Sequence, residues 1–375
     1  MIIDLRKLFG INTFVLSSIL IILIISIPAL GVLRVPLLIA QITFFSLACI
    51  VYKGKVGINF AQNILLILIG YAVIQNLYLS EDWIVIIQSI AMPALLFMTI
   101  QFAQINASYF YESLAYKRLA KYIFILLPFF AISFNDWSES RSAGLFMNPN
   151  ITAHMAVMLS PFVLLGLNKR SMKALLIFVV FLILVITASR SGLLAFLLAV
   201  SSYIFVSYFR KIKFIPLFIL ISSTTLISMW GVDLAVWIFQ EFMTKGEHNS
   251  RLLYTGYNGR DVLMVHALER FNMQPWFGLG FDGAKFEIDG HELGTHNGML
   301  DLLLRLGIIG TALFSFFSIC LCYMASKADK KVKPVVVMSL VAIFSLSTNS
   351  SAFFVFNYLF LYAVILTYVG YCKHR

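Results

Sequence analysis

Long apolar runs alternate with short polar segments along nearly the whole chain. Each run is close to twenty residues long, the length that an α-helix needs to cross about 30 Å of hydrocarbon. The runs lack the period of two that outer-membrane barrel strands show. We therefore predict an all-α, polytopic integral membrane protein with about twelve transmembrane helices. The predicted spans are roughly 14–33, 35–52, 58–79, 83–103, 119–134, 151–167, 174–189, 191–209, 214–231, 297–323, 334–347 and 352–371.

One polar segment, 232–296, is far longer than the others and is rich in aromatic residues, so it can pack. Within it, residues 260–271 form an amphipathic pattern whose apolar face holds Val262, Leu263, Val265 and Leu268. Pro275 and the glycines that follow end this helix. We expect a small helical cap on the outer membrane surface. The expected organisation is a bundle over 1–231, a periplasmic loop domain over 232–296 and the rest of the bundle over 297–375.

Composition supports the membrane class: 61% of the residues are hydrophobic, 12% are charged, and the mean hydropathy is +0.91. A soluble domain is about half apolar and a quarter charged. The formal charge of +11 would suggest nucleic acid in a soluble protein. Here the basic residues cluster between apolar runs, so we interpret them as topology signals and expect no nucleic-acid partner.

The charges also predict the orientation of the spans. If the N-terminus is cytoplasmic, the inner segments hold nineteen of the twenty-eight Lys and Arg residues. We therefore expect both termini in the cytoplasm, with the first apolar run as a span and not a signal peptide. The inner clusters are Arg6/Lys7, Lys53/Lys55, Lys117/Arg118/Lys121, Lys169/Arg170/Lys173, Arg210/Lys211/Lys213, Lys327/Lys330/Lys331/Lys333 and Lys373/Arg375.

Cysteine and histidine spacings predict no disulfide framework, no metal and no cofactor. None of the four cysteines (Cys49, Cys320, Cys322 and Cys372) lies in the long loop. The CxC pair near a helix end lacks partner residues, and no HxxxH or HExxH pattern occurs.

Three arginines on the predicted outer side are candidate site residues. Arg190 lies in a turn between two spans, where outer positive charge is otherwise sparse and the backbone can bind an anion; snorkelling to lipid headgroups is the alternative. Arg141 lies in the other outer loop, and its alternative is a loop cation balanced by Glu139. Arg260 starts the loop helix, and its alternative is a solvated side chain on a polar face.

His296 is the candidate for proton transfer, because it lies where the long polar loop meets an apolar run. An imidazole with a pKa near ~6.5 suits general acid–base catalysis at neutral pH. An N-cap histidine bonded to backbone is the alternative. His154, His248, His266 and His291 are weaker candidates, and Asp301 and Arg305 are expected to form a structural ion pair.

Together these residues suggest a ligand. Guanidinium groups bind phosphate oxygens in a planar fork, and a lipid pyrophosphate is the membrane-resident ligand with that charge. Arginines would stabilise charge on a departing pyrophosphate, while a histidine accepts the proton of an attacking sugar hydroxyl.

Three patches resemble the bacterial O-antigen ligase and polysaccharide polymerase superfamily, over roughly residues 135–315. The most specific pattern is His296-Asn297, nine residues, then Gly307-Ile308-Ile309-Gly310. The patches are Arg141 to Phe146 with Asn148-Pro149-Asn150, Ser189-Arg190-Ser191-Gly192, and Gly259-Arg260 with Pro275 to Phe281 leading to His296-Asn297.

The resemblance implies an inverting, metal-independent glycosyltransferase at the periplasmic face of the bacterial inner membrane. It would use an undecaprenyl-pyrophosphate-linked saccharide as donor and a glycan or lipid-linked glycan as acceptor, and it allows a chain-length-regulating co-polymerase as a partner. Carried over by motif, Arg190, Arg260 and Arg141 would hold pyrophosphate, His296 would be catalytic, and Ser189 and Asn297 would support them. An O-antigen polymerase is favoured; a ligase acting on lipid A core and a polysaccharide transporter or flippase are the alternatives.

Overall fold

The computed structural model describes residues 59–79, 83–106, 114–132, 144, 148–209, 211–242, 260–280, 285–288, 291–295, 297–348 and 357–374. The predicted spans 14–33 and 35–52 lie outside the described residues. The elements are α4 Phe60–Leu79, α5 Trp83–Asn106, α6 Leu114–Ile132, α7 Pro149–Gly166, α8 Arg170–Ile186, α9 Arg190–Tyr208, α10 Phe214–Phe242, α11 Arg260–Met273, β1 Lys285–Ile288, β2 His291–Gly294, α12 Gly298–Ser326, α13 Lys333–Ser347 and α14 Asn357–His374.

Each predicted span within the described residues is a helix, and most boundaries agree within a few residues. The start of α6 was predicted too late, because buried Tyr116 packs against α7 and donates its hydroxyl to the Phe162 carbonyl (2.5 Å). Among the described helices, four are long and apolar enough to cross a membrane: α4, α7, α9 and α12. The protein is therefore embedded in a membrane, and the count of twelve spans stays a prediction.

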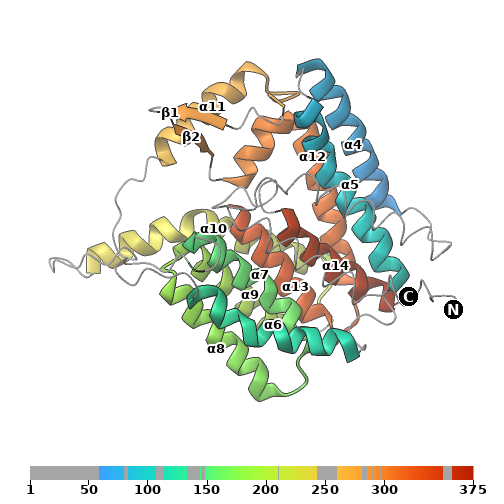
Figure 1. The fold of residues 1–375 in the computed structure, drawn as a ribbon, viewed down its shortest axis with the longest axis vertical. Coiled ribbons are helices and arrows are strands. Elements are labelled where there is room, and N and C mark those ends of the chain that lie inside the picture. The colour runs from blue at the N-terminus through green and yellow to red at the C-terminus, as the bar shows by residue number, and fades with distance from the viewer. Residues whose placement is uncertain are drawn as a thin grey trace, which may run out of the picture.

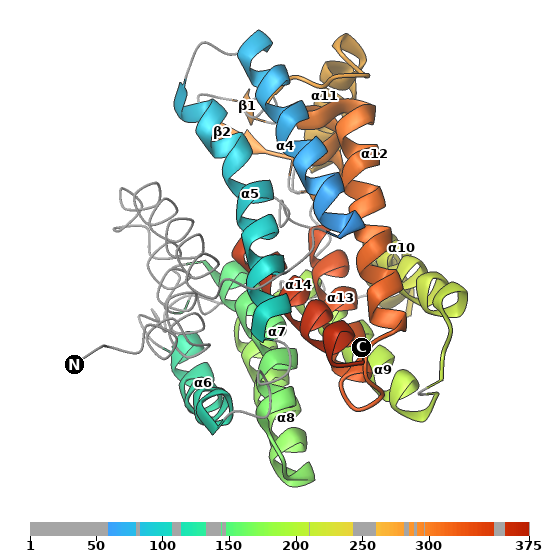
Figure 2. The same ribbon diagram turned by 90° about the vertical axis from the view of Figure 1, so that its right-hand side faces the viewer.

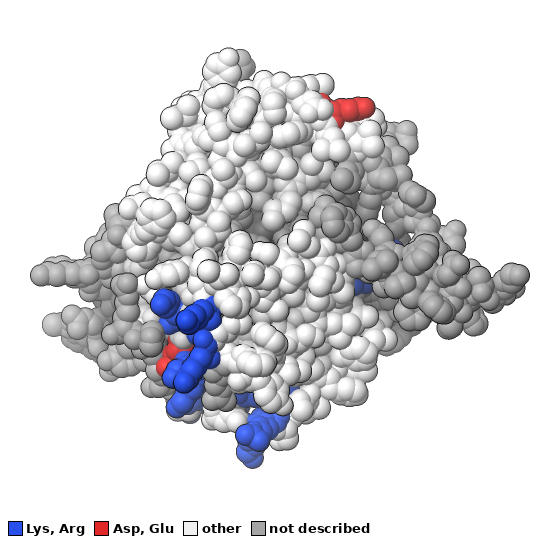
Figure 3. Space-filling model, turned by 180° about the vertical axis from the view of Figure 1, so that it is seen from behind, with Lys and Arg blue, Asp and Glu red and all other residues white. Residues whose placement is uncertain are grey.

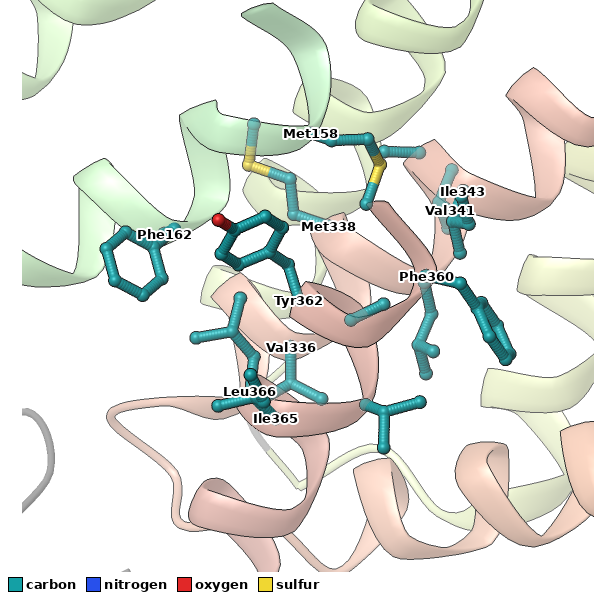
Figure 4. Packing of buried hydrophobic residues seen from close by; sticks show 14 of the residues in the cluster. Met158, Phe162, Val336, Met338, Val341, Ile343, Phe360, Tyr362, Ile365 and Leu366 are labelled. Atoms are coloured by element: carbon teal, nitrogen blue, oxygen red, sulfur yellow. The ribbon is translucent and has the colours of Figure 1, made fainter. Parts of the chain in front are cut away.

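The core of the bundle is α13, which is buried along its whole length. A helix that is apolar all round belongs inside a bundle, and α7, α9, α10 and α14 surround this one. In Figure 4, Met158 and Phe162 of α7 face Met338 of α13 and Tyr362 of α14. By contrast, α8 buries only one stripe and also exposes apolar side chains, as a helix facing lipid does.

The helices α4, α5 and α12 lie side by side along the length of the molecule (Figure 2). Contacts between distant segments show that the spans alternate in direction. At one end the Tyr368 hydroxyl lies 3.3 Å from Asn59 Oδ1, and the amide of Asp329 donates to the Gly370 carbonyl (3.0 Å). At the other end Ser228 of α10 donates to the Ser345 carbonyl of α13 (2.9 Å).

Charged side chains are unevenly distributed over the surface of the molecule. On the face shown in Figure 3, Lys and Arg gather at the lower edge, beneath a broad uncharged surface. The described clusters around the α7–α8 and α12–α13 turns are those predicted to be cytoplasmic. The assignment of this edge to the cytoplasm stays a prediction.

The described part of the long loop contains a two-stranded hairpin as well as α11, which the expectation of a small helical cap did not include, and the position of this part on the outer membrane surface stays a prediction. After α11, strands β1 and β2 pair antiparallel, with Glu287 opposite Glu292. The residues between them are Asp289-Gly290, a dipeptide typical of two-residue hairpin loops. This unit lies beside the start of α12 at the top of Figure 1.

The face by which α11 packs also differs from the expected one. Ala267 is fully buried and, with Phe271, packs against Leu300 and Leu304 of α12. Val265 and Leu268, from the predicted apolar face, are 55% and 44% exposed. Val265 and Leu268 thus face outward, and the small Ala267 makes the contact.

Candidate functional site

The turn between α8 and α9 carries Arg190. After α8 ends, Ala188 adopts a left-handed conformation with φ of 46°, which a residue other than glycine rarely adopts. The buried Ser189 follows as the N-cap of α9, and its hydroxyl accepts a hydrogen bond from the Gly192 amide (3.3 Å). Arg190 is therefore the first residue of α9, at the positive end of the helix.

The neighbouring helix α7 starts beside this turn. Asn148 caps α7 by accepting hydrogen bonds from the amides of Asn150 and Ile151, with Pro149 at the first helical position. The cap is thus Asn148, and Asn150 is the second residue of the helix. Asn150 instead accepts a hydrogen bond from the Ser189 hydroxyl (3.2 Å), which joins the first two sequence patches.

Two helix starts therefore meet beside Arg190. Gly192 permits the close approach, because a Cβ there would lie 3.0 Å from that of Ala153. Buried His154 also crosses the contact, with Nε2 3.4 Å from the Ser191 hydroxyl. Each helix N-terminus carries about half a positive charge. Two such ends side by side, with Arg190 at the start of one of them, give this turn a positive electrostatic character.

The start of α12 forms a second cluster. Asn297 caps this helix by accepting hydrogen bonds from the amides of Met299 and Leu300 (3.0 and 3.2 Å). The cap position is therefore occupied by Asn297, and not by a histidine. The Thr295 hydroxyl accepts from the Asn297 amide (3.2 Å) and lies 2.9 Å from its carbonyl, so the residues on either side of position 296 hold each other.

Further along, α12 is broken at Gly307, whose φ of 62° and ψ of −169° are not helical. This conformation is available to glycine and strained for other residues. Gly278 in the segment after α11 also has a positive φ, 74°, and a Cβ there would lie 2.4 Å from the Gly307 amide nitrogen. Because neither glycine has a side chain, the two backbones can come into contact. This contact requires the motif glycine at position 307.

The segment 275–280 fills the break by exchanging backbone hydrogen bonds with α12. The amides of Ile308 and Ile309 donate to the carbonyls of Pro275 and Trp276 (2.9 and 3.2 Å). The carbonyls of Leu304 and Arg305 accept from Leu279 and Gly280 (2.7 and 3.1 Å). Backbone groups freed inside a membrane must find partners within the protein, and this segment supplies them.

An ion pair lies in the first half of α12. Arg305 Nε is 3.2 Å from Asp301 Oδ2, and both side chains are buried. The predicted ion pair between Asp301 and Arg305 is therefore present in the structure. The weaker candidate His266 is exposed and pairs with Glu269 on the surface of α11 (3.3 Å).

The predicted site residues fall in two described clusters. Ser189 and Arg190 lie at the joined starts of α7 and α9, whereas Asn297 lies at the start of α12, beside α11 and the hairpin (Figure 1). Arg141, His296 and the side chain of Arg260 lie outside the described residues, although Arg260 is the first residue of α11. That all of them form one site stays a prediction.

Two functional candidates were missed by the sequence analysis. Tyr71 and Gln75 of α4 donate hydrogen bonds to backbone carbonyls at the break in α12. Gln75 and Tyr71, one helical turn apart within a predicted span, were a usable signal, because polar side chains inside a span need partners.

The described residues form the helices of a membrane-embedded protein, with two joined helix starts beside Arg190 and a broken helix bridged by the segment 275–280. Residues 174–315 match the family described as O-antigen ligase. The resemblance to the O-antigen ligase and polysaccharide polymerase superfamily is thus confirmed over this region, which contains Arg190, Arg260 and His296 but not Arg141. No curated protein matches the chain.

Proposed function

We propose that this protein is an inverting membrane glycosyltransferase that uses an undecaprenyl-pyrophosphate-linked saccharide as donor. The observation that carries the proposal is the joined start of α7 and α9 beside Arg190. The positive ends of two helices lie side by side there, and Arg190 is the first residue of one of them, which favours the binding of a departing pyrophosphate. Arg260 and Arg141 would complete the anion site, at the periplasmic face of the bacterial inner membrane.

In this proposal His296 accepts the proton of the acceptor hydroxyl as that oxygen attacks the sugar carbon. The bond from this carbon to pyrophosphate breaks as the new glycosidic bond forms, so the configuration inverts. Position 296 lies between Thr295 and Asn297, which hydrogen-bond to each other just before the start of α12. The positive charges of the arginines balance the negative charge of the departing pyrophosphate, which a divalent metal would otherwise balance.

The acceptor distinguishes two candidate functions. We favour a polymerase that joins lipid-linked repeat units of O-antigen or a related surface polysaccharide, because nothing in the loop sequences indicates a dedicated docking surface for a phosphorylated core. The second candidate is a ligase that moves the glycan to lipid A core, which the description of the matched family favours. Deleting the gene and separating surface glycans on a gel distinguishes them. A core bearing one repeat unit indicates a polymerase, and polymer held on carrier lipid indicates a ligase.

A transporter is the remoter alternative, and the break in α12 bears on it. Broken helices in transporters use their freed backbone groups to coordinate substrate or ions. Here the amides of Ile308 and Ile309 and the carbonyls of Leu304 and Arg305 bond the segment 275–280. The break therefore supports the protein's own architecture, which favours an enzyme.

The direct test uses purified protein and lipid-linked donor. We expect Arg190→Ala and His296→Ala to abolish transfer while protein still reaches the membrane, and Arg190→Lys to be impaired because a point charge lacks the fork. Arg170→Ala, at the other end of α8, is the matched control and should transfer normally. Activity should survive EDTA. Normal transfer by Arg190→Ala would remove this residue from the site, and a loss that magnesium restores would overturn the metal-free mechanism.

A further inference from the structure

Two side chains of α4 contact both the broken part of α12 and the segment 275–280. The Tyr71 hydroxyl lies 2.8 Å from the Phe277 carbonyl and 2.7 Å from that of Leu306. Gln75, one helical turn further on, directs its amide group to the carbonyls of Phe277 and Arg305, the latter at 2.6 Å. Both side chains therefore contact both sides of the junction between α12 and the segment 275–280.

These contacts reach carbonyls that a continuous helix would use itself. In an unbroken α12 the carbonyls of Arg305 and Leu306 would accept hydrogen bonds from residues 309 and 310. Gly307 interrupts this ladder, and the amide of Ile309 is bonded to Trp276 instead. A freed carbonyl in a membrane interior is costly unless a donor reaches it. The Gly280 amide already donates to the Arg305 carbonyl; Tyr71 supplies a donor to the Leu306 carbonyl, and Gln75 supplies a second donor to that of Arg305.

Gln75 is 6% exposed, and the packing at this point is tight. A Cβ at Gly310 would lie 2.8 Å from the ring of Tyr71, so α12 has no room to shift toward α4. The contacts from α4 therefore support the first half of α12. This half begins at Gly298, and its N-cap Asn297 follows position 296 in the sequence.

We propose that Tyr71 and Gln75 are positioning residues for the reaction. They lock the break in α12 and so fix the direction of its first half, which begins at Gly298, two positions after His296 in the sequence. This inference rests on the proposed function for its catalytic consequence, whereas the lock itself can be measured without catalysis. Neither residue contacts substrate in this account.

The test compares Tyr71→Phe and Gln75→Met with two matched controls on the same helix. Tyr78→Phe changes a tyrosine that is 88% exposed. Gln62→Met changes a buried glutamine whose side chain accepts from the Asn59 amide at the other end of α4. Hydrogen exchange of the purified protein in nanodiscs is followed in peptides covering 275–280 and 304–310. We expect exchange in these peptides to be about tenfold faster in both test variants, because each test variant loses a hydrogen bond of typical strength at the junction. Exchange should be unchanged in both controls.

The second measurement is steady-state transfer with purified undecaprenyl-pyrophosphate-linked saccharide. We expect kcat to fall about tenfold in both test variants while the donor KM stays within about twofold, since the anion site is untouched. Tyr71→Phe removes only a hydroxyl group and introduces no larger side chain. This variant therefore still tests the proposal if Gln75→Met does not fold. Unchanged exchange in the variants overturns the lock, and faster exchange with normal kcat overturns the positioning role. A wild type that transfers no saccharide refutes the proposed function instead, while the exchange result still decides the lock.

Discussion

Replacing Gly307 with alanine tests the account of the broken helix most directly. A Cβ at this position would lie 2.4 Å from the Trp276 carbonyl oxygen and 2.5 Å from the Gly278 amide nitrogen. Both are backbone atoms, so no side chain can rotate away. The φ of 62° with ψ of −169° adds strain for any residue other than glycine. Gly307→Ala must therefore displace the segment 275–280.

The cost follows from what the displacement breaks. Strain at such a backbone position costs about 1–3 kcal/mol. Losing the hydrogen bonds from Ile308 and Ile309 to the segment costs about 1 kcal/mol each. The expected destabilisation is roughly 3–5 kcal/mol, a large part of the 5–15 kcal/mol by which proteins are typically stable. The same displacement removes the support of the first half of α12, so transfer activity should also be lost.

Gly70→Ala on α4 is the matched control, because Gly70 is exposed and a Cβ there would meet nothing within 4 Å. It should be neutral or stabilising by up to about 1 kcal/mol. The assay is unfolding in mixed micelles with increasing SDS, followed by far-UV circular dichroism. If Gly307→Ala matched Gly70→Ala in unfolding free energy, the junction between α12 and the loop segment would not exist as described.

Three further predictions concern the helix starts, the ion pair and the topology. Ser189→Ala removes the cap of α9 and the hydrogen bond to Asn150; it should cost about 1–2 kcal/mol in the same unfolding assay, and an unchanged midpoint would contradict the joined helix starts. Asp301→Ala should cost about 3–5 kcal/mol because it leaves Arg305 buried without its carboxylate, whereas Asp301→Leu combined with Arg305→Met should cost much less; equal costs would argue against a buried pair. Reporter fusions at Lys211 and Asn258 should report opposite sides of the membrane, and the same side for both would remove the predicted orientation.

The helices were predictable because a membrane imposes one length and one apolar composition on every span. The end of α10 was placed too early, at 231 and not 242, because its last turns remain apolar where the chain was expected to leave the bilayer. The hairpin was missed because its strands have four residues each, too few for a clear alternation. Only the Asp289-Gly290 dipeptide marked it.

For the candidate site, motif positions were found but not their physical roles. The sequence marks Gly307 and the segment from Pro275 as parts of one pattern, yet their backbone contact joins residues thirty positions apart that no local rule connects. The link between Asn150 and Ser189 is likewise a tertiary hydrogen bond. Tyr71 and Gln75 lie more than two hundred residues before their partners, so their role could only come from the structure.

The break in α12 also has a consequence for biogenesis. Every group that satisfies it, in α4 and in the segment 275–280, precedes α12 in the chain. During synthesis from the N-terminus these partners have already left the ribosome when Gly307 emerges. The hydrogen-bonding partners of the interrupted helix are therefore already synthesised when it enters the membrane. In a circular permutant that moved α4 behind α12, the partners from α4 would be synthesised only after the break.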